Sequence, residues 1–386
     1  MKNVYWLAIG AFLVATAELV VSGILKELAE DLGVTTAQAG QLVTAYSLGF
    51  AIGTPILIAA TARAARKSML LASLAAFVLA SAASALSDGF AVLLALRVLL
   101  GVSAGVYCVV ALGSIAKLVP AERIGSAIGT IALAFGSSMV LGVPIGIAMT
   151  EAWGWESIFY AMAGGSLLVI GLLKRMLPDV EGDAPAPFGK QFAVLGSLTV
   201  IGPLFLSMLW SAGNSVMLTY MAPLVQDELG LSSGALGGVL LALGLIGIVG
   251  SKLGGYGVDR FGSGTMLVVS LALSAASLIM LPLLAGASPA AGLALIGLWG
   301  LGMFVTAPAL NAHFVRTAPG SANLVLGMNT SFTHLGLALG AGAGGYFYNI
   351  ADSSADLPWL AGASLLVAFG LSLAAARVRG AKTLAA

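Results

Sequence analysis

DLGVTTAQAG (31–40) and ELGLSSGALG (228–237) are two versions of one pattern, separated by 197 residues in a chain of 386. The same separation carries Arg63 onto Arg260. A separation of 199 residues relates a basic residue and a proline further along each half, pairing Lys117 with Arg316 and Pro120 with Pro319. A duplicated structural unit is the simplest explanation of these matches.

The composition indicates that the duplicated unit lies in a membrane. Hydrophobic residues make up 59% of the chain and charged residues 9%, with a mean hydropathy of +1.04. Soluble domains use about 45–50% apolar and about 25% charged residues. The 51 glycines allow membrane helices to approach closely. The net charge of +1 and the lack of a basic block argue against a nucleic-acid partner.

Breaks at charged or Gly/Pro-rich stretches divide the chain into twelve apolar segments, and about 20 residues are enough to span a bilayer. The fourth, seventh and eleventh segments are long enough to tilt or to extend past the bilayer. We therefore predict an all-α polytopic membrane protein with twelve transmembrane helices in two parallel six-helix repeats. The first segment contains Glu18 and is interpreted as a retained span, not a cleaved signal. The predicted spans are 5–25, 41–62, 68–86, 90–119, 125–149, 157–173, 195–225, 234–256, 264–285, 290–315, 321–350 and 357–376.

The positive charges predict the orientation. With the N-terminus inside, all 17 lysines and arginines except Lys26 and Arg97 fall on the inner side. Positively charged loops favour the cytoplasm, so both termini are expected there.

The longest polar interruption is KRMLPDVEGDAPAPFGK (174–190), at the middle of the chain. Its prolines and mixed charges are typical of a linker. We expect an N-terminal six-helix bundle over 1–176, a cytoplasmic linker over 177–191 and a C-terminal six-helix bundle over 192–386.

The loop after the eighth predicted span contains Gly255, Asp259, Arg260 and Gly262 in the order G-x-x-x-D-R-x-G. The glycines permit a tight turn and close helix contact, and Asp259 could accept hydrogen bonds from a helix N-terminus. The corresponding first-half loop, TARAARK, has Ala62 and Ala65 in place of the acid and the second glycine. It keeps three cations that could serve a gate or simply anchor the inner face, namely Arg63, Arg66 and Lys67.

Two further motifs lie inside predicted helices. The fourth contains Arg97 and Gly101 as R-x-x-x-G, and the fifth contains LGVPIG with Gly142, Pro144 and Gly146. Together with the loop motif, they resemble the major facilitator superfamily, whose fold is the predicted architecture. In that family the loop residues gate the cytoplasmic side, and a glycine and proline motif in the fifth helix is associated with antiporters.

Longer stretches of sequence resemble one group within this superfamily, the drug and metabolite:proton antiporters. Within that group they are most similar to bacterial exporters of purine bases or nucleosides, with exporters of sugars and of chloramphenicol nearby. The stretches are AELVVSGIL, AGQLVTAYSLG, PALNAHF and NTSFTHLGLALG. This resemblance implies a monomeric secondary transporter of the bacterial inner membrane. It would export a small organic molecule in exchange for protons by alternating access, without a cofactor, and could contribute to multidrug resistance. A facilitator or importer is the alternative.

Glu18 and Arg97 are the two charged residues deep within predicted spans. An ionisable residue in a membrane helix is retained when it has a partner or a function. Glu18 could exchange a proton near Arg97, or the two could form a permanent salt bridge.

The candidate substrate pocket combines aromatic and neutral polar side chains. Such a pocket suits a flat heterocycle or a neutral amphiphile, although each aromatic could equally pack between helices. The candidates are Tyr46, Tyr107, Trp210, Asn214, Asn329, Phe332, Thr333 and His334.

Other chemistries lack support in the sequence. Cys108 is the single cysteine, no His/Glu/Cys cluster has metal-ligand spacing, and no P-loop is present. A membrane enzyme or sensor would need a catalytic constellation or a soluble domain, so a transporter is the prediction, not an enzyme.

Overall fold

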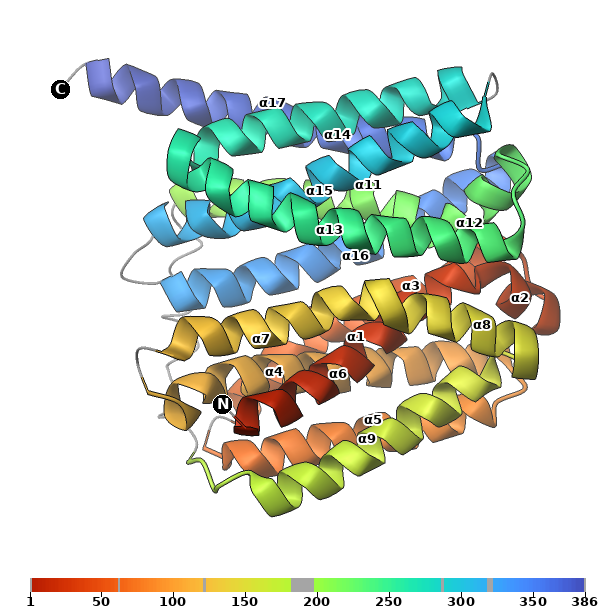
Figure 1. Cartoon of the computed structure of the whole chain (residues 1–386), viewed down its shortest axis with the longest axis vertical. Coiled ribbons are helices and arrows are strands. Elements are labelled where there is room, and N and C mark those ends of the chain that lie inside the picture. The colour runs from red at the N-terminus through yellow and green to blue at the C-terminus, as the bar shows by residue number, and fades with distance from the viewer. Residues whose placement is uncertain are drawn as a thin grey trace. The chain divides into compact units, whose positions relative to one another are not determined.

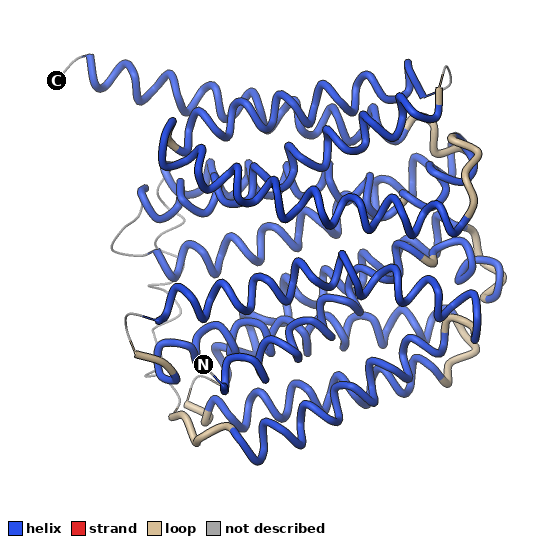
Figure 2. Tube along the Cα trace, viewed as in Figure 1, coloured by secondary structure: helices blue, strands red, loops and turns tan. Residues whose placement is uncertain are grey.

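A computed structural model describes residues 2–61, 63–120, 123–181, 198–285, 288–317 and 322–384. In these ranges it contains helices and no strands (Figure 2). The chain divides into two compact units, Met1–Phe188 (unit 1) and Gly189–Ala386 (unit 2). Residues 182–191 of the predicted linker lie outside the described residues, so the linker remains a prediction.

The helices of unit 1 form six passes (Figure 1). Two of these passes each contain a π-helical turn: η1 joins α3 to α4, and η3 joins α7 to α8. The passes are α1 (Lys2–Gly23), α3–η1–α4 (Thr36–Leu48, Gly49–Gly53, Thr54–Ala60), α5 (Arg66–Ala85), α6 (Phe90–Leu118), α7–η3–α8 (Ile124–Ser137, Ser138–Gly142, Val143–Trp153) and α9 (Glu156–Met176). A short helix, α2 (Leu25–Asp31), follows α1.

Unit 2 also contains six passes in its described residues. The first of these also ends in a π-helical turn. The passes are α11–α12–η5 (Leu198–Thr219, Met221–Pro223, Leu224–Glu228), α13 (Ser233–Phe261), α14 (Ser263–Ala285), α15 (Pro289–Thr317), α16 (Ala322–Ala351) and α17 (Leu357–Leu384).

The described helices fit the predicted membrane spans. Ten are long and apolar enough to cross a membrane, and α17 contributes a shorter apolar stretch, Leu357–Leu373. The sequence-based boundaries fall within five residues of the helix ends, except that α17 continues to Leu384, eight residues beyond the predicted end. The seventh pass is helical to Glu228, three residues beyond the predicted end, because η5 extends it.

Each π-helical turn lies beside a proline. Pro55 follows η1, Pro144 follows η3 and Pro223 precedes η5. Proline lacks the backbone N–H that an α-helix uses, and π-turns often accompany such defects and functional sites. The hydrogen-bond pattern of these three passes therefore changes near a proline instead of continuing as a regular α-helix.

The repeated sequence folds into the same turn in both units. Gly33 and Gly230 have φ of +62° and +66°, a left-handed conformation that glycine adopts without steric cost. Two residues later, the hydroxyls of Thr35 and Ser232 cap the next helix by accepting from the backbone N–H of Gln38 and Ala235. All three pairs are 197 residues apart.

The repeat also supplies a carboxylate that holds a distant turn. Asp31 Oδ2 accepts a hydrogen bond from Trp155 Nε1 at 2.8 Å, between α8 and α9. Glu228 Oε1 accepts from Ser353 Oγ at 2.9 Å and Ser354 Oγ at 3.1 Å, between α16 and α17. We call these contacts the carboxylate clasps. Each one ties the end of the first pass of its unit to the turn between the fifth and sixth passes.

Replacing Asp31 by alanine should lower the stability of the purified protein. Trp155 is 4% exposed, so its indole N–H would lose its acceptor in a largely buried position. The expected loss is about 1–2 kcal/mol of unfolding free energy. Thermal unfolding in detergent measures it. The exposed carboxylate of Asp88 provides the control variant, Asp88→Ala, and an equal loss in both variants would contradict the role of the clasp.

Candidate functional site

Arg97 is the most deeply buried charge of unit 1, with 0% of its surface exposed. Its Nε donates to the carbonyl of Leu42 at 3.1 Å and its Nη1 to the carbonyl of Ala17 at 2.8 Å. The guanidinium also lies 4.5 Å from the centre of the Tyr46 ring. A planar guanidinium can donate in several fixed directions at once. Arg97 of α6 thereby connects α1 with α3.

One nitrogen of this guanidinium, Nη2, is buried and has no hydrogen-bond partner in the described part of the chain. Glu18 follows Ala17 on α1 and is half-buried. Its charge acts electrostatically on both Arg97 and Tyr46. The structure thus brings the two predicted coupling residues together. Whether Glu18 exchanges protons or forms a permanent pair with Arg97 remains a prediction.

The motif glycines explain how the helices approach Arg97. A Cβ on Gly101 would overlap the carbonyl oxygen of Tyr46, so α6 can lie directly against α3 only with glycine here. On the other side of α1, a Cβ on Gly142 would overlap Thr16 and one on Gly146 would overlap Val20. Pro144 lies in the first turn of α8, after η3. LGVPIG therefore forms the face that packs on α1 beside Glu18.

Tyr46 and Tyr107 are buried, and their hydroxyls already have partners. Tyr46 donates to the carbonyl of Val14 at 3.1 Å and Tyr107 to the carbonyl of Leu7 at 2.9 Å. Both contacts fasten α1 to its neighbours, and Gly10 leaves the room that the Tyr107 hydroxyl occupies. The predicted pocket residues of unit 1 therefore serve helix packing in this structure.

Two of the predicted gate cations of unit 1, Arg66 and Lys67, contact the segment after α9, residues 177–181, which we call the strap. Lys67 Nζ lies 3.4 Å from Asp179 Oδ1, and the backbone N–H of Arg66 donates to the carbonyl of Val180 at 2.9 Å. Lys117 Nζ donates to the carbonyl of Glu181 at 2.8 Å. The strap thus provides a carboxylate near the loop in which alanine replaces the motif aspartate.

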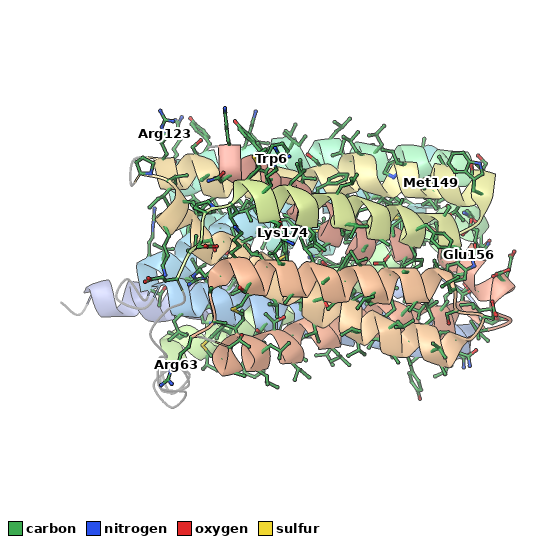
Figure 3. All side chains as sticks on the ribbon, turned by 90° about the horizontal axis from the view of Figure 1, so that it is seen from below. Trp6, Arg63, Arg123, Met149, Glu156 and Lys174 are labelled. Atoms are coloured by element: carbon green, nitrogen blue, oxygen red, sulfur yellow. The ribbon has the colours of Figure 1, made fainter. Side chains whose placement is uncertain are left out.

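Three of the labelled charges of unit 1 lie toward its two ends (Figure 3). Arg63 and Arg123 project from one end, whereas Glu156 lies at the opposite end. Arg63 is exposed. Which of these ends faces the cytoplasm remains a prediction.

The loop motif of unit 2 differs from expectation in one contact. Gly262, with φ of +84°, turns the chain tightly between α13 and α14 as predicted. A Cβ on Gly255 would meet nothing within 4 Å, so the expected close contact at Gly255 is wrong. Gly254 and Gly257 make it instead, against Pro308 and Met266. Their positions on α13, not the motif spacing, point them at the neighbouring helices.

The charged residues of this motif lie at the surface. Arg260 Nη1 donates to the Tyr256 hydroxyl at 2.8 Å, and its guanidinium lies 5.6 Å from the centre of the Phe261 ring. Asp259 is exposed and makes no hydrogen bond or ion pair with the described residues. Its expected contact with a helix N-terminus remains untested, because residues 318–321, ahead of α16, lie outside the described ranges.

In unit 2, Asn214 is buried and uses its amide within the unit. Its Oδ1 accepts from Trp299 Nε1 at 2.9 Å, and its Nδ2 donates to the carbonyl of Trp210 at 2.8 Å. Sequence reasoning missed Trp299, because nothing in its local sequence distinguishes it from a lipid-facing aromatic residue.

The other candidates of unit 2 cluster on α11 and α16. Phe332 packs edge-on against Phe205 with ring centres 5.8 Å apart, and the carbonyl of Thr333 accepts from Ser211 Oγ at 2.8 Å. His334 Nδ1 lies 3.0 Å from the carbonyl oxygen of Thr330 in its own helix. Trp210 Nε1 and Asn329 Oδ1 are buried without partners.

The carboxyl group of Glu27 on α2 is another feature that the sequence did not predict. Burial raises its pKa, and the negative charges of Glu30 and Glu151 act in the same direction. Its Oε2 has no hydrogen-bond partner. No sequence signal marks it, because α2 alternates charged and apolar residues like any surface helix.

We expect Gly142→Ala to destabilise the protein by about 1–3 kcal/mol, the usual cost of overpacking. The new methyl group would overlap Thr16 and push α1 away from η3. Gly136→Ala is the matched control, because nothing lies within 4 Å of its added Cβ. Chemical or thermal unfolding of both variants measures the difference, and equal stability would contradict the proposed packing.

The raised pKa of Glu27 predicts a pH-dependent stability. Between the ordinary glutamate pKa and the raised value, the folded state binds more protons than the unfolded state, so this contribution to stability falls as pH rises. The Tm of Glu27→Gln minus that of the parent protein should therefore be larger at pH 8 than at pH 5. Asp88→Asn, at an exposed position that does not act on Glu27, is the control. A difference for Glu27→Gln that stays constant with pH would refute the shift.

Comparisons with known proteins agree with this architecture. The family model of the Major Facilitator Superfamily matches residues 7–341. The MFS-type transporter YbcL of Bacillus subtilis (strain 168) is 36% identical over 371 residues, covering 96% of this chain and 95% of the relative. A chloramphenicol efflux pump of Mycobacterium tuberculosis (strain ATCC 25618 / H37Rv) is 29% identical, covering 89% and 84% of the two chains.

Solved structures support the fold independently. The crystal structure of a D-xylose-proton symporter matches with a TM-score of 0.78 at 17% sequence identity, covering 96% of each chain. The fold class predicted from the sequence is therefore confirmed, and the relatives are transporters, not enzymes. This multi-pass membrane protein belongs to the Major Facilitator Superfamily.

Proposed function

We propose that this chain is a proton-coupled antiporter that exports a neutral organic molecule across the bacterial cytoplasmic membrane. Its two six-helix units would alternate access to the two sides, with both termini in the cytoplasm. The observation that carries this proposal is the half-buried Glu18 beside Arg97, whose guanidinium is wholly buried and retains one unpartnered nitrogen. A chloramphenicol efflux pump among the relatives supports export.

The geometry suggests how a proton could be coupled to movement. Ionised Glu18 attracts Arg97, and protonation removes that attraction. The nearby α1 backbone is held by Arg97 at Ala17 and packs on Gly142 through Thr16. A change of charge at Glu18 would thus act directly on the contacts of α1 with α6 and with η3. The strap and the two inner loops are the proposed gate elements.

Proton coupling can be tested with the purified protein in proteoliposomes, using chloramphenicol as the transported probe. Glu18→Gln keeps the shape of the side chain but cannot ionise, so we expect it to lose most of the transport driven by a pH gradient. Exchange of the probe without a gradient should continue. The exposed Glu30→Gln is the control and should behave like the parent protein.

The direction of transport is tested in the same vesicles by reversing the gradient. Export by antiport requires the probe to move against the proton flow. Movement of the probe together with protons, or full gradient-driven transport by Glu18→Gln, would overturn the proposed mechanism.

A further inference from the structure

Three polar atoms in the middle of unit 2 are buried without a hydrogen-bond partner among the residues that the structure describes. They are Ser207 Oγ and Trp210 Nε1 on α11 and Asn329 Oδ1 on α16. A buried polar group that lacks a partner is costly, because it has given up its bonds to water. Several such atoms close together therefore call for an explanation other than packing.

The pairing of α11 with α16 places these atoms at one level. Two hydroxyls of α11 donate to carbonyls of α16, Ser211 to Thr333 at 2.8 Å and Ser215 to Leu337 at 2.7 Å. Both pairs differ by 122 residues, so the helices run in the same direction. The same difference sets Ser207 level with Asn329. Trp210 is three residues further along, about 5 Å at the helical rise.

Helical periodicity also places them on adjoining faces. Ser207 and Trp210 are i and i+3 neighbours on α11. Asn329 is seven residues before Gly336, so both share the face of α16 that meets α11, where a Cβ on Gly336 would overlap the carbonyl of Met208. Phe332, close to the same face, packs on Phe205.

The polar side chains one turn further along α11 have hydrogen-bond partners, unlike Ser207, Trp210 and Asn329. Asn214 uses both ends of its amide within the unit, with Trp299 and with the carbonyl of Trp210. Ser211 and Ser215 each have an acceptor on α16. The unpartnered atoms are therefore confined to one level of the α11 and α16 pair.

We propose that Ser207, Trp210 and Asn329 form a subsite for a neutral substrate that carries an amide edge, with a carbonyl beside an N–H group. The indole N–H of Trp210 can donate to that carbonyl, the amide oxygen of Asn329 can accept from that N–H, and the Ser207 hydroxyl can do either. None of the three side chains is charged, so an ion would find no counter-charge in this subsite. The proposal rests on the transport function above and adds the substrate class.

The phenylalanine pair suits such a ligand. Phe205 is 45% exposed and meets Phe332 edge-on. Aromatic rings of this kind provide an apolar surface for a planar group. The subsite thus combines hydrogen bonds at one edge of the ligand with apolar contact at its face.

Binding to the purified full-length protein tests the subsite directly. The probes are uracil, hypoxanthine and 2-pyridone, cyclic amides whose carbonyl and N–H lie side by side at one edge, and 1,3-dimethyluracil, in which both N–H groups are blocked. We expect at least one of the first three to bind, and dimethyluracil to bind much more weakly than uracil if uracil is that probe. Trp210→Phe and Asn329→Leu should each raise the Kd of the bound probe by at least about tenfold, the effect of one lost hydrogen bond.

Stability without ligand separates binding from a structural role. Trp210→Phe and Asn329→Leu remove unpartnered atoms, so their Tm should equal or exceed that of the parent protein. Asn214→Leu removes two existing hydrogen bonds and should lower the Tm. Asn349→Leu, at an exposed position of α16, is the control for both measurements.

The proposal fails if none of the three amide probes binds the parent protein, or if the Trp210 and Asn329 variants bind as the parent does. It also fails if these variants lose as much stability as Asn214→Leu. Normal proton-driven export combined with unchanged binding in the variants would overturn the subsite alone. The expected binding pattern without proton-driven export would support the subsite and overturn the proposed coupling.

Discussion

A guanidinium buried among membrane helices has no water to satisfy it, so the protein must supply its partners. Arg97 meets most of this constraint by donating from Nε and Nη1 to backbone carbonyls of two other helices and by lying on an aromatic ring, which leaves Nη2 without a partner among the described residues. The centre of unit 1 depends on that arrangement. It fixes the position of α1 and, with it, the place of Glu18. The same residue is therefore both a structural connection and the electrostatic neighbour of the proposed proton carrier.

Close approach of helices is the second requirement, and small residues meet it. Gly101 lets α6 reach the backbone of α3, and Gly142 and Gly146 let the fifth pass reach α1. Unit 2 uses the same principle where Gly336 and Gly340 meet carbonyls of α11. Its centre differs in chemistry, because neutral hydroxyl, amide and indole groups take the place of the charged residues. The two units thus share a packing rule while offering different surfaces to a solute.

The sequence predicted the fold well because hydropathy marks which segments form membrane helices and the repeat shows that the helices are arranged in two similar units. The match between residues 31–40 and 228–237 predicted a repeated unit, whereas the left-handed glycine and the helix cap inside it came only from the structure. Contacts between distant side chains could not be predicted. Which glycines of α13 contact a neighbouring helix depends on how the helices cross. The contacts are made by Gly254 and Gly257, not by the predicted Gly255. Trp299 and the strap at Asp179 were likewise invisible, because their partners lie far away in the chain.

The carboxylate clasps show that each unit secures its own end with residues from its own half. After a duplication, such self-sufficiency lets the two copies diverge separately: one copy can gain or lose a charge in its interior without disturbing how the other closes. Both halves hold an acidic residue at the clasp, whereas their interiors differ in chemistry, with a buried arginine in unit 1 and neutral polar groups in the described part of unit 2.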